Sequence, residues 1–125
     1  MAWGFPYDSD AGRHTAAAIT SLMTGEAYRY SAEVAKRMGP YDGYAINKEP
    51  QLNVISMHRD AVSRVRSSLV ADRAIYDAAE KAWNDALSLG RRYGVRNAQV
   101  TLLAPTGTIS LMMDFASTVI EQKFE

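Results

Sequence analysis

The chain has 125 residues, of which 47% are hydrophobic and 22% charged, and its 14 lysines and arginines balance its 14 aspartates and glutamates. This length and composition indicate one globular domain with a modest core, and they exclude a disordered tail. The zero net charge and the lack of long runs of like charge argue against nucleic acid or a charged membrane surface as a partner.

The sequence contains no cysteine, which excludes a disulfide framework, a thiolate metal site and any thiol or thiyl chemistry supplied by this chain. No apolar run approaches the roughly 20 residues of a membrane span, and the start, MAWGFPYDSD, lacks the pattern of a signal peptide. We therefore expect a cytoplasmic protein without a membrane partner.

The first helix is predicted after an irregular lead-in, with Ser9 or Asp10 as its N-cap. Apolar side chains then recur on one helical face: Ala16, Ile19, Leu22 and Met23. Thr24 and Gly25 are expected to interrupt or end this helix, because glycine weakens a helix interior. A second, short amphipathic stretch is predicted over residues 27–38.

The segment GPYDGY, residues 39–44, combines glycine, proline and aspartate and predicts a turn. Asn47 is expected to cap the next helix, with Glu49 at its positive end and Pro50 in its first turn, where a missing N–H costs little. The predicted buried stripe of this helix consists of Leu52, Ile55, Val62 and Val65.

A further helix is predicted from about Asp72 to Leu89, with Gly90 or Gly94 ending it and two arginines near its negative end. Its apolar side carries Ile75, Ala79, Ala82, Trp83, Ala86 and Leu87.

Only the segment QVTLLA, residues 99–104, has strand character. It is apolar on both faces from Leu102 to Ala104, which predicts a buried strand in a sheet covered by helices. A lone strand would bury N–H and C=O groups without partners, at a cost of about 1–3 kcal/mol per group. The predicted fold class is therefore α/β, as a mainly helical fragment with one or few strands.

This strand is followed by PTGT and a new apolar segment. Backbone N–H groups at such a helix start attract anions, Gly107 lets the backbone approach a ligand, and the hydroxyls of Thr106, Thr108 and Ser110 add donors. The pattern favours phosphate without a metal. It lacks the lysine of a P-loop and the GxGxxG spacing, so from the residues alone an ordinary capped turn is the commoner explanation.

Three segments carry a resemblance to a known family. They are PYDSDAGR at residues 6–13, TSLMTGEAYRYSAEVAKRMGPYDGYAINKEP at 20–50, and RNAQVTLLAPTGTISLMMD at 96–114. In this order they resemble the adenosylcobalamin-dependent (class II) ribonucleotide reductases. The resemblance implies a ten-stranded α/β barrel around a cysteine-bearing finger loop. In that family the cofactor converts this cysteine to a thiyl radical, which removes the 3′-hydrogen of the ribose.

The resemblance also implies which residues and ligands take part. The loop that matches here contacts substrate phosphates in the family, which implies phosphate binding by Pro105, Thr106, Gly107, Thr108, Ile109 and Ser110. The implied partners are a ribonucleoside di- or triphosphate and, for the longer enzyme, a dithiol reductant of the thioredoxin type. Adenosylcobalamin is implied without any contact assigned to this chain, and a homodimer of the longer enzyme stays open.

The family's catalytic and reducing cysteines have no counterpart in this cysteine-free chain. We therefore expect residues 1–125 to be part of a reductase barrel domain, with no complete second domain, no catalytic residue and no activity alone. After Asp114 the sequence departs from the family, because Val119 and Gln122 replace a glycine and a proline. The alternative is a non-catalytic helical interaction or regulatory module derived from a reductase.

The remaining polar residues suggest structural roles. His14 and His58 lack the spacing of metal ligands, so no metal site is expected. Arg96 and Asn97 lead directly into the predicted strand and match the family, either to reach phosphate or for packing. Two carboxylate pairs are expected at helix caps or exposed faces rather than as acid and base: Asp8 with Asp10, and Asp72 with Asp77.

Overall fold

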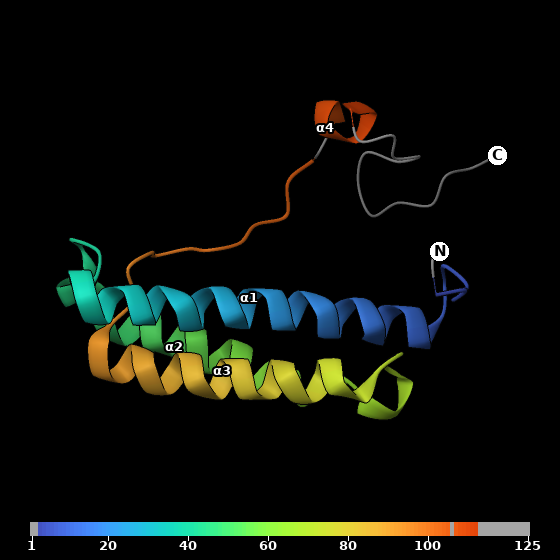
Figure 1. Cartoon of the computed structure of the whole chain (residues 1–125), viewed down its shortest axis with the longest axis horizontal. Helices are drawn as coiled ribbons and strands as arrows, with labels where there is room; N and C mark the ends of the chain where they lie inside the picture. Colours follow the sequence, from blue (N-terminus) through green and yellow to red (C-terminus); the bar gives the residue numbers. More distant parts are fainter. Residues whose placement is uncertain (1–2, 106, 113–125) are drawn as a thin grey trace.

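The computed structural model describes residues 3–105 and 107–112. Its elements are α1 (Asp10–Met38), α2 (Tyr44–Val62), the 3-10 turn η1 (Ser67–Leu69), α3 (Arg73–Tyr93) and α4 (Gly107–Met112). Helices α1, α2 and α3 lie side by side as a bundle (Figure 1). After α3 the chain passes α1 and runs along its side opposite α3, and residues 102–105 then lead away from the bundle toward α4. None of the helices described is long and apolar enough to cross a membrane.

The centre of the bundle is Trp83 on α3, which is 2% exposed and whose indole N–H donates to Ser21 Oγ at 3.0 Å. Gly25 lies against this ring, and α1 continues through it without a break. The predicted interruption at residues 24–25 is therefore wrong. A glycine costs about 1 kcal/mol in a helix interior, but here it lets α1 and α3 approach closely around the buried indole.

Several predicted helix boundaries are confirmed. Ser9 caps α1, where its Oγ accepts from the Gly12 N–H at 3.1 Å. Asp72 caps α3 by accepting from the Ala74 N–H at 2.8 Å. Gly94 ends α3 with a φ of 75°, a left-handed conformation that glycine adopts at little cost.

The start of α2 differs from the prediction. The helix begins at Tyr44, after Gly43, so Asn47 lies inside it and donates from its side chain to the Gly43 carbonyl at 2.9 Å. Pro50 consequently lies in the second turn rather than the first. Burial explains the earlier start, because Tyr44 is 6% exposed and its hydroxyl donates to the Gly90 carbonyl at 3.2 Å.

Most residues of the predicted apolar stripes of α2 and α3 face the core, but Val65, assigned to the stripe of α2, lies beyond the end of that helix. On α2, Ile55 and Val62 are buried, and on α3 the buried residues are Ala79, Ala82, Trp83, Ala86, Leu87 and Gly90. On α1, however, Ile19 and Met23 of the predicted stripe are 43% and 58% exposed. The face of α1 that contacts the bundle is instead built from mostly small residues: Thr15, Ala18, Gly25, Tyr28, Ser31, Ala32 and Ala35.

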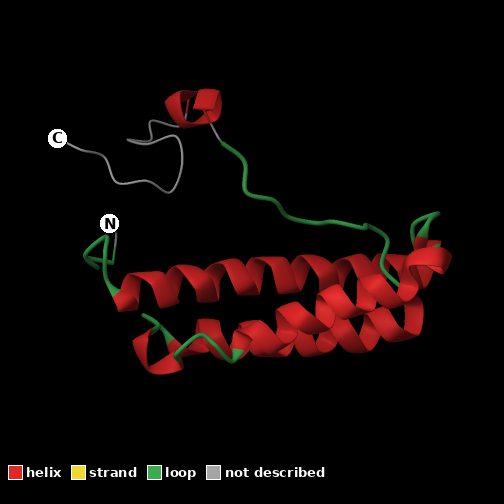
Figure 2. Ribbon diagram, turned by 180° about the vertical axis from the view of Figure 1, so that it is seen from behind, coloured by secondary structure: helices red, strands yellow, loops and turns green. Residues whose placement is uncertain are grey.

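The predicted strand at residues 99–104 is not formed, and Figure 2 shows only helices and loops in the described part of the chain. Leu102 and Leu103 are 71% and 86% exposed rather than buried. A strand needs a neighbouring strand for its N–H and C=O groups, and the described residues offer none. The helical part of the expected α/β fragment is therefore observed, and the barrel strands are not.

Candidate phosphate-binding loop

The chain that leads to the candidate loop is fixed to the bundle from Val95 onward. Val95 is fully buried, and its carbonyl accepts from the Tyr41 N–H at 3.1 Å. The Arg96 N–H donates to the Ser31 carbonyl at 3.1 Å. The buried Ser31 Oγ accepts from the Asn97 N–H at 2.9 Å and donates to Asn97 Oδ1 at 3.0 Å.

Further contacts continue along α1. The Tyr28 hydroxyl donates to the Ala98 carbonyl at 3.3 Å, and the hydroxyls of Thr24 and Thr101 are 3.0 Å apart. From residue 96 to residue 101 the segment contacts first Ser31, then Tyr28 and then Thr24, so it runs antiparallel to α1. The anchoring contacts of Ser31, Tyr28 and Thr24 were not predicted from the sequence, where three hydroxyl-bearing side chains on one helical face were the available signal.

Arg96 and Asn97 have packing roles in this arrangement. The Arg96 guanidinium donates to the Pro40 carbonyl at 3.1 Å, which ties the start of the segment to the turn before α2. Asn97 is held by Ser31 through both its backbone and its side chain. The sequence left open whether Arg96 and Asn97 reach phosphate or serve packing, and the observed contacts fit packing.

The candidate loop itself extends outward from this anchored segment. Pro105, Gly107, Thr108 and Ile109 are exposed, and α4 begins at Gly107. Thr106 lies outside the described residues, as does the side chain of Ser110 within α4. A Cβ added to Gly107 would meet no atom within 4 Å, so the space beside its backbone is open. A helix start directs N–H groups outward, which is the arrangement that phosphate groups bind.

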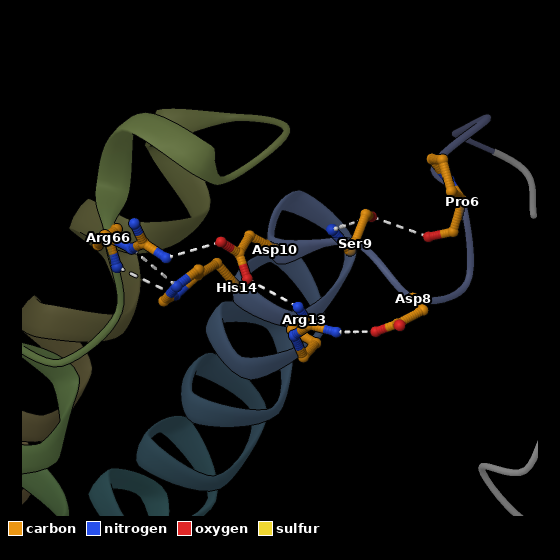
Figure 3. Close-up of polar contacts among 8 residues, drawn as sticks. Pro6, Asp8, Ser9, Asp10, Arg13, His14 and Arg66 are labelled. Carbon is orange, nitrogen blue, oxygen red and sulfur yellow. Dashed lines mark hydrogen bonds and ion pairs between the residues drawn. The ribbon is translucent and has the colours of Figure 1, made fainter.

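A second polar cluster joins the start of α1 to the chain before η1 (Figure 3). The Arg66 guanidinium pairs with Asp10 at 3.0 Å, and its Nε lies 3.1 Å from His14 Nε2. Arg13 pairs with Asp8 and, at 2.7 Å, with Asp10. Hydrogen bonds from Arg13 and then Arg66 hold the pKa of Asp10 below its ordinary value. The cluster is a structural clasp, and it confirms the expectation of a helix-start role for Asp10.

The other residues considered from the sequence lie apart from the loop. His58 stacks on Trp83 with ring centroids 5.3 Å apart, and Asp77 pairs with Arg73 at 3.2 Å. Within residues 3–105 and 107–112, no group of three or more histidines, aspartates and glutamates is arranged to hold a metal ion.

Comparison with known proteins gives consistent matches over nearly the whole chain. The sequence profile of the family described as "Ribonucleotide reductase, barrel domain" matches residues 1–124. The vitamin B12-dependent ribonucleotide reductase of Streptomyces coelicolor is 50% identical over 121 residues, which cover 97% of this chain and 12% of that protein. The reductase of the same name from Rhodopirellula baltica is 49% identical, with 97% of this chain and 11% of that protein covered.

A more distant relative, the vitamin B12-dependent ribonucleotide reductase of Agrobacterium fabrum, is 42% identical over 139 residues, which cover 99% of this chain and 11% of that protein. The chain therefore spans only 11–12% of the length of these relatives.

Proposed function

The chain belongs to the ribonucleotide reductase barrel-domain family, and from this premise we propose that it is the phosphate-binding segment of an adenosylcobalamin-dependent ribonucleotide reductase. The observation that carries the proposal is 50% identity over 97% of the chain to a reductase whose name states its vitamin B12 dependence. The longer enzyme would convert ribonucleotides to 2′-deoxyribonucleotides by thiyl radical chemistry, with cysteines that this chain does not contain.

Residues 105–110 are proposed to bind the phosphates of the substrate. Support comes from the exposure of Pro105, Gly107, Thr108 and Ile109, and from the open space beside Gly107. The hydroxyl of Thr108 and the N–H groups at the start of α4 are suitable donors to phosphate oxygens. The hydrogen bonds of residues 96–101 to α1 give the loop a fixed point of origin.

No contact of the described residues is assigned to cobalamin. His14 lies against Arg66, its ring nitrogens 3.2 Å from the backbone N and 3.1 Å from Nε of that residue, and His58 stacks on Trp83. We assign the cofactor, the catalytic cysteines and the contact with a thioredoxin-type dithiol to the longer reductase, and no chemical step to this chain.

A second candidate is a non-catalytic helical module derived from a reductase. The observation that favours it is the completeness of the bundle: no buried side-chain nitrogen or oxygen among the described residues lacks a hydrogen-bond partner. Trp83, Ile55 and Val95 are also fully buried, although the described residues form no strand. A bundle packed in this way can persist without the rest of a barrel.

Nucleotide titration of the folded chain separates the two functions. A ribonucleoside diphosphate, the corresponding triphosphate and the phosphate-free nucleoside are added in turn while the amide resonances are followed by NMR. The proposed function predicts shifts at the amides of residues 106–110 with both phosphorylated ligands and none with the nucleoside. A folded sample that shows no shift at these residues would refute phosphate binding and favour the helical module.

A further inference from the structure

The end of the bundle at which α1 and α3 finish is rich in lysine and arginine. The last turn of α1 carries Lys36 and Arg37, and the last turn of α3 carries Arg91 and Arg92. Figure 1 shows both helices ending on the same side of the bundle, at the left of the view. Arg96 joins this group, because its guanidinium donates to a carbonyl in the turn before α2. These residues are here called the basic end.

The cations of the basic end lack acidic partners. Most other cations of the bundle contact an aspartate or glutamate: Arg13, Arg29, Arg59, Arg66, Arg73 and Lys81. Among the described residues, no carboxylate lies within ion-pair distance of any residue of the basic end. The turn before α2 and the start of that helix add Asp42, Lys48 and Glu49, whose charges leave a single negative charge.

Basic residues at helix ends also have an ordinary explanation. A helix C-terminus carries about half a negative charge, which lysine or arginine in the last turn compensates. The C-termini of α1 and α3 together supply about one negative charge, whereas every residue of the basic end supplies a full positive charge. Compensation of the helix dipoles therefore accounts for only part of the basic end, and an excess of positive charge is left over.

Several of these cations are held in place. Lys36 Nζ lies 5.4 Å from the centroid of the Tyr93 ring, and Cζ of Arg92 lies 5.1 Å from it. Both contacts are of the cation–π type, which restrains the side chains. The hydrogen bond of Arg96 to the Pro40 carbonyl, at 3.1 Å, restrains a further guanidinium. Restrained side chains lose less conformational entropy on binding, so the basic end is preorganised to bind negative charge.

The placement of the cations favours an extended anion over a single phosphate. They come from separate segments, the end of α1, the end of α3 and residue 96, whereas a compact ligand needs polar groups that converge on it. An acidic polypeptide carries carboxylates at intervals along its chain, and a guanidinium pairs with a carboxylate through two parallel hydrogen bonds. Nucleic acid is disfavoured, because the net charge of the chain is zero.

We infer that the basic end is a docking surface for an acidic segment of a partner protein. Charge complementarity carries the inference, since carboxylates of the partner would give these cations the pairing that most other cations of the bundle already have. The inference goes beyond the proposed function and does not depend on phosphate binding by residues 105–110.

A fluorescently labelled polyglutamate peptide serves as the probe, and polyglutamine is its uncharged control. Binding to the full chain is followed by anisotropy, and NMR amide shifts locate the contact. Arg91→Glu and, separately, Arg37→Glu each reverse one exposed charge of the basic end. Arg64→Glu is the matched control, because Arg64 is exposed and follows α2 at the opposite end of the bundle. Thermal unfolding midpoints show that each variant is folded, and Arg37→Glu decides the result if Arg91→Glu is not.

We expect polyglutamate to bind and polyglutamine not to bind, with amide shifts at residues 36–39 and 91–96 and a Kd that rises with salt. Arg91→Glu and Arg37→Glu should each raise the Kd about five- to tenfold, whereas Arg64→Glu should change it by less than about twofold. Absence of polyglutamate binding would overturn the inference, as would equal Kd values for the Arg91 and Arg64 variants. Tighter binding of DNA than of polyglutamate would also overturn it, because the occupant would then be a nucleic acid.

The same comparison is made in a chimera, the Streptomyces coelicolor reductase with its aligned segment replaced by this chain. A higher Kd for Arg91→Glu than for Arg64→Glu is expected there too. Equal values in the chimera would overturn the inference, because the rest of the reductase would then cover the basic end. No nucleotide is involved, so failure here is distinguishable from failure of the proposed phosphate binding.

Discussion

Gly25 on α1 lies so close to Trp83 on α3 that an added Cβ would be 3.1 Å from both Cδ1 and Nε1 of the indole ring. Gly25→Ala should gain about 1 kcal/mol of helix propensity but force the ring out of its place, at a cost of typically 1–3 kcal/mol. The ring has little freedom to move, because it is 2% exposed and bonded to Ser21. We expect a net loss of roughly 1 kcal/mol in the free energy of unfolding, measured by urea denaturation.

Ala17→Gly, at an exposed position of the same helix, isolates the propensity effect and should cost about 1 kcal/mol. If Gly25→Ala instead stabilised the chain by the amount that Ala17→Gly removes, the close approach of α1 and α3 would be contradicted.

Gly25 also shows which part of the fold could not be predicted from the sequence. Propensity alone indicates a break at Gly25, whereas the indole that occupies the space beside it comes from 58 residues further along the chain. The caps at Ser9 and Asp72 and the end of α3 at Gly94 were predictable, because these signals act within one helical turn. Local chemistry was sufficient for these three boundaries, whereas tertiary packing decided the continuity of α1 at Gly25 and the start of α2 at Tyr44.

The candidate site also has one part that local sequence predicts and one part that depends on tertiary packing. The exposed loop around Gly107 follows from its own residues, while its attachment to Ser31, Tyr28 and Thr24 depends on how α1 packs. The sequence predicted that Ala16, Ile19, Leu22 and Met23 share one face of α1, and the structure leaves Ile19 and Met23 of this stripe exposed. Periodicity indicates that Ile19 and Met23 share a face, but it does not say which element covers that face.

Ser31→Ala should loosen the segment that leads to the candidate loop. The Oγ of Ser31 is bonded to both the backbone N–H and the side chain of Asn97, and the residue is 3% exposed. Removing it leaves those groups without partners, which should cost about 1–3 kcal/mol. Faster amide hydrogen exchange is expected at residues 96–101. Ser88→Ala, at an exposed position of α3, is the control, and equal exchange in both variants would contradict the anchoring role.

Tyr28 should make stability depend on pH in the alkaline range. Burial raises the pKa of its hydroxyl above the ordinary value of about 10. The folded chain therefore holds this proton more tightly than the unfolded chain, and the contribution is present below about pH 10 and lost as the pH rises through the folded pKa. Tyr28→Phe should flatten the fall in unfolding free energy above pH 10. Tyr30→Phe, at an exposed position of α1, is the matched control, and equal slopes for the two variants would refute the prediction.

Asp10 should give the opposite dependence at acid pH. Its pKa is lowered by hydrogen bonds from Arg13 and Arg66, so its contribution is present above the unfolded value of about 4 and lost as the pH falls through the folded pKa. Asp10→Asn should therefore show a shallower loss of stability on acidification, followed by chemical denaturation at a series of pH values. Asp42→Asn, in the exposed turn before α2, is the comparison. An unchanged acid profile in Asp10→Asn would show that the clasp does not stabilise the fold.

Thr108→Val tests the proposed phosphate loop with a change that keeps the shape of the side chain. Thr108 is exposed, so loss of its hydroxyl should leave the thermal unfolding midpoint unchanged. If the hydroxyl donates to a substrate phosphate, its removal should cost about 1–1.5 kcal/mol of binding, or roughly a five- to tenfold rise in Kd for a ribonucleoside diphosphate. The Kd comes from NMR titration.

Thr20→Val, at an exposed position of α1, removes a hydroxyl far along the sequence from the loop and should bind like the unaltered chain. Equal Kd values for the Thr108 and Thr20 variants would remove this hydroxyl from the proposed site, because a donor to a charged phosphate oxygen cannot be lost without weakening the complex.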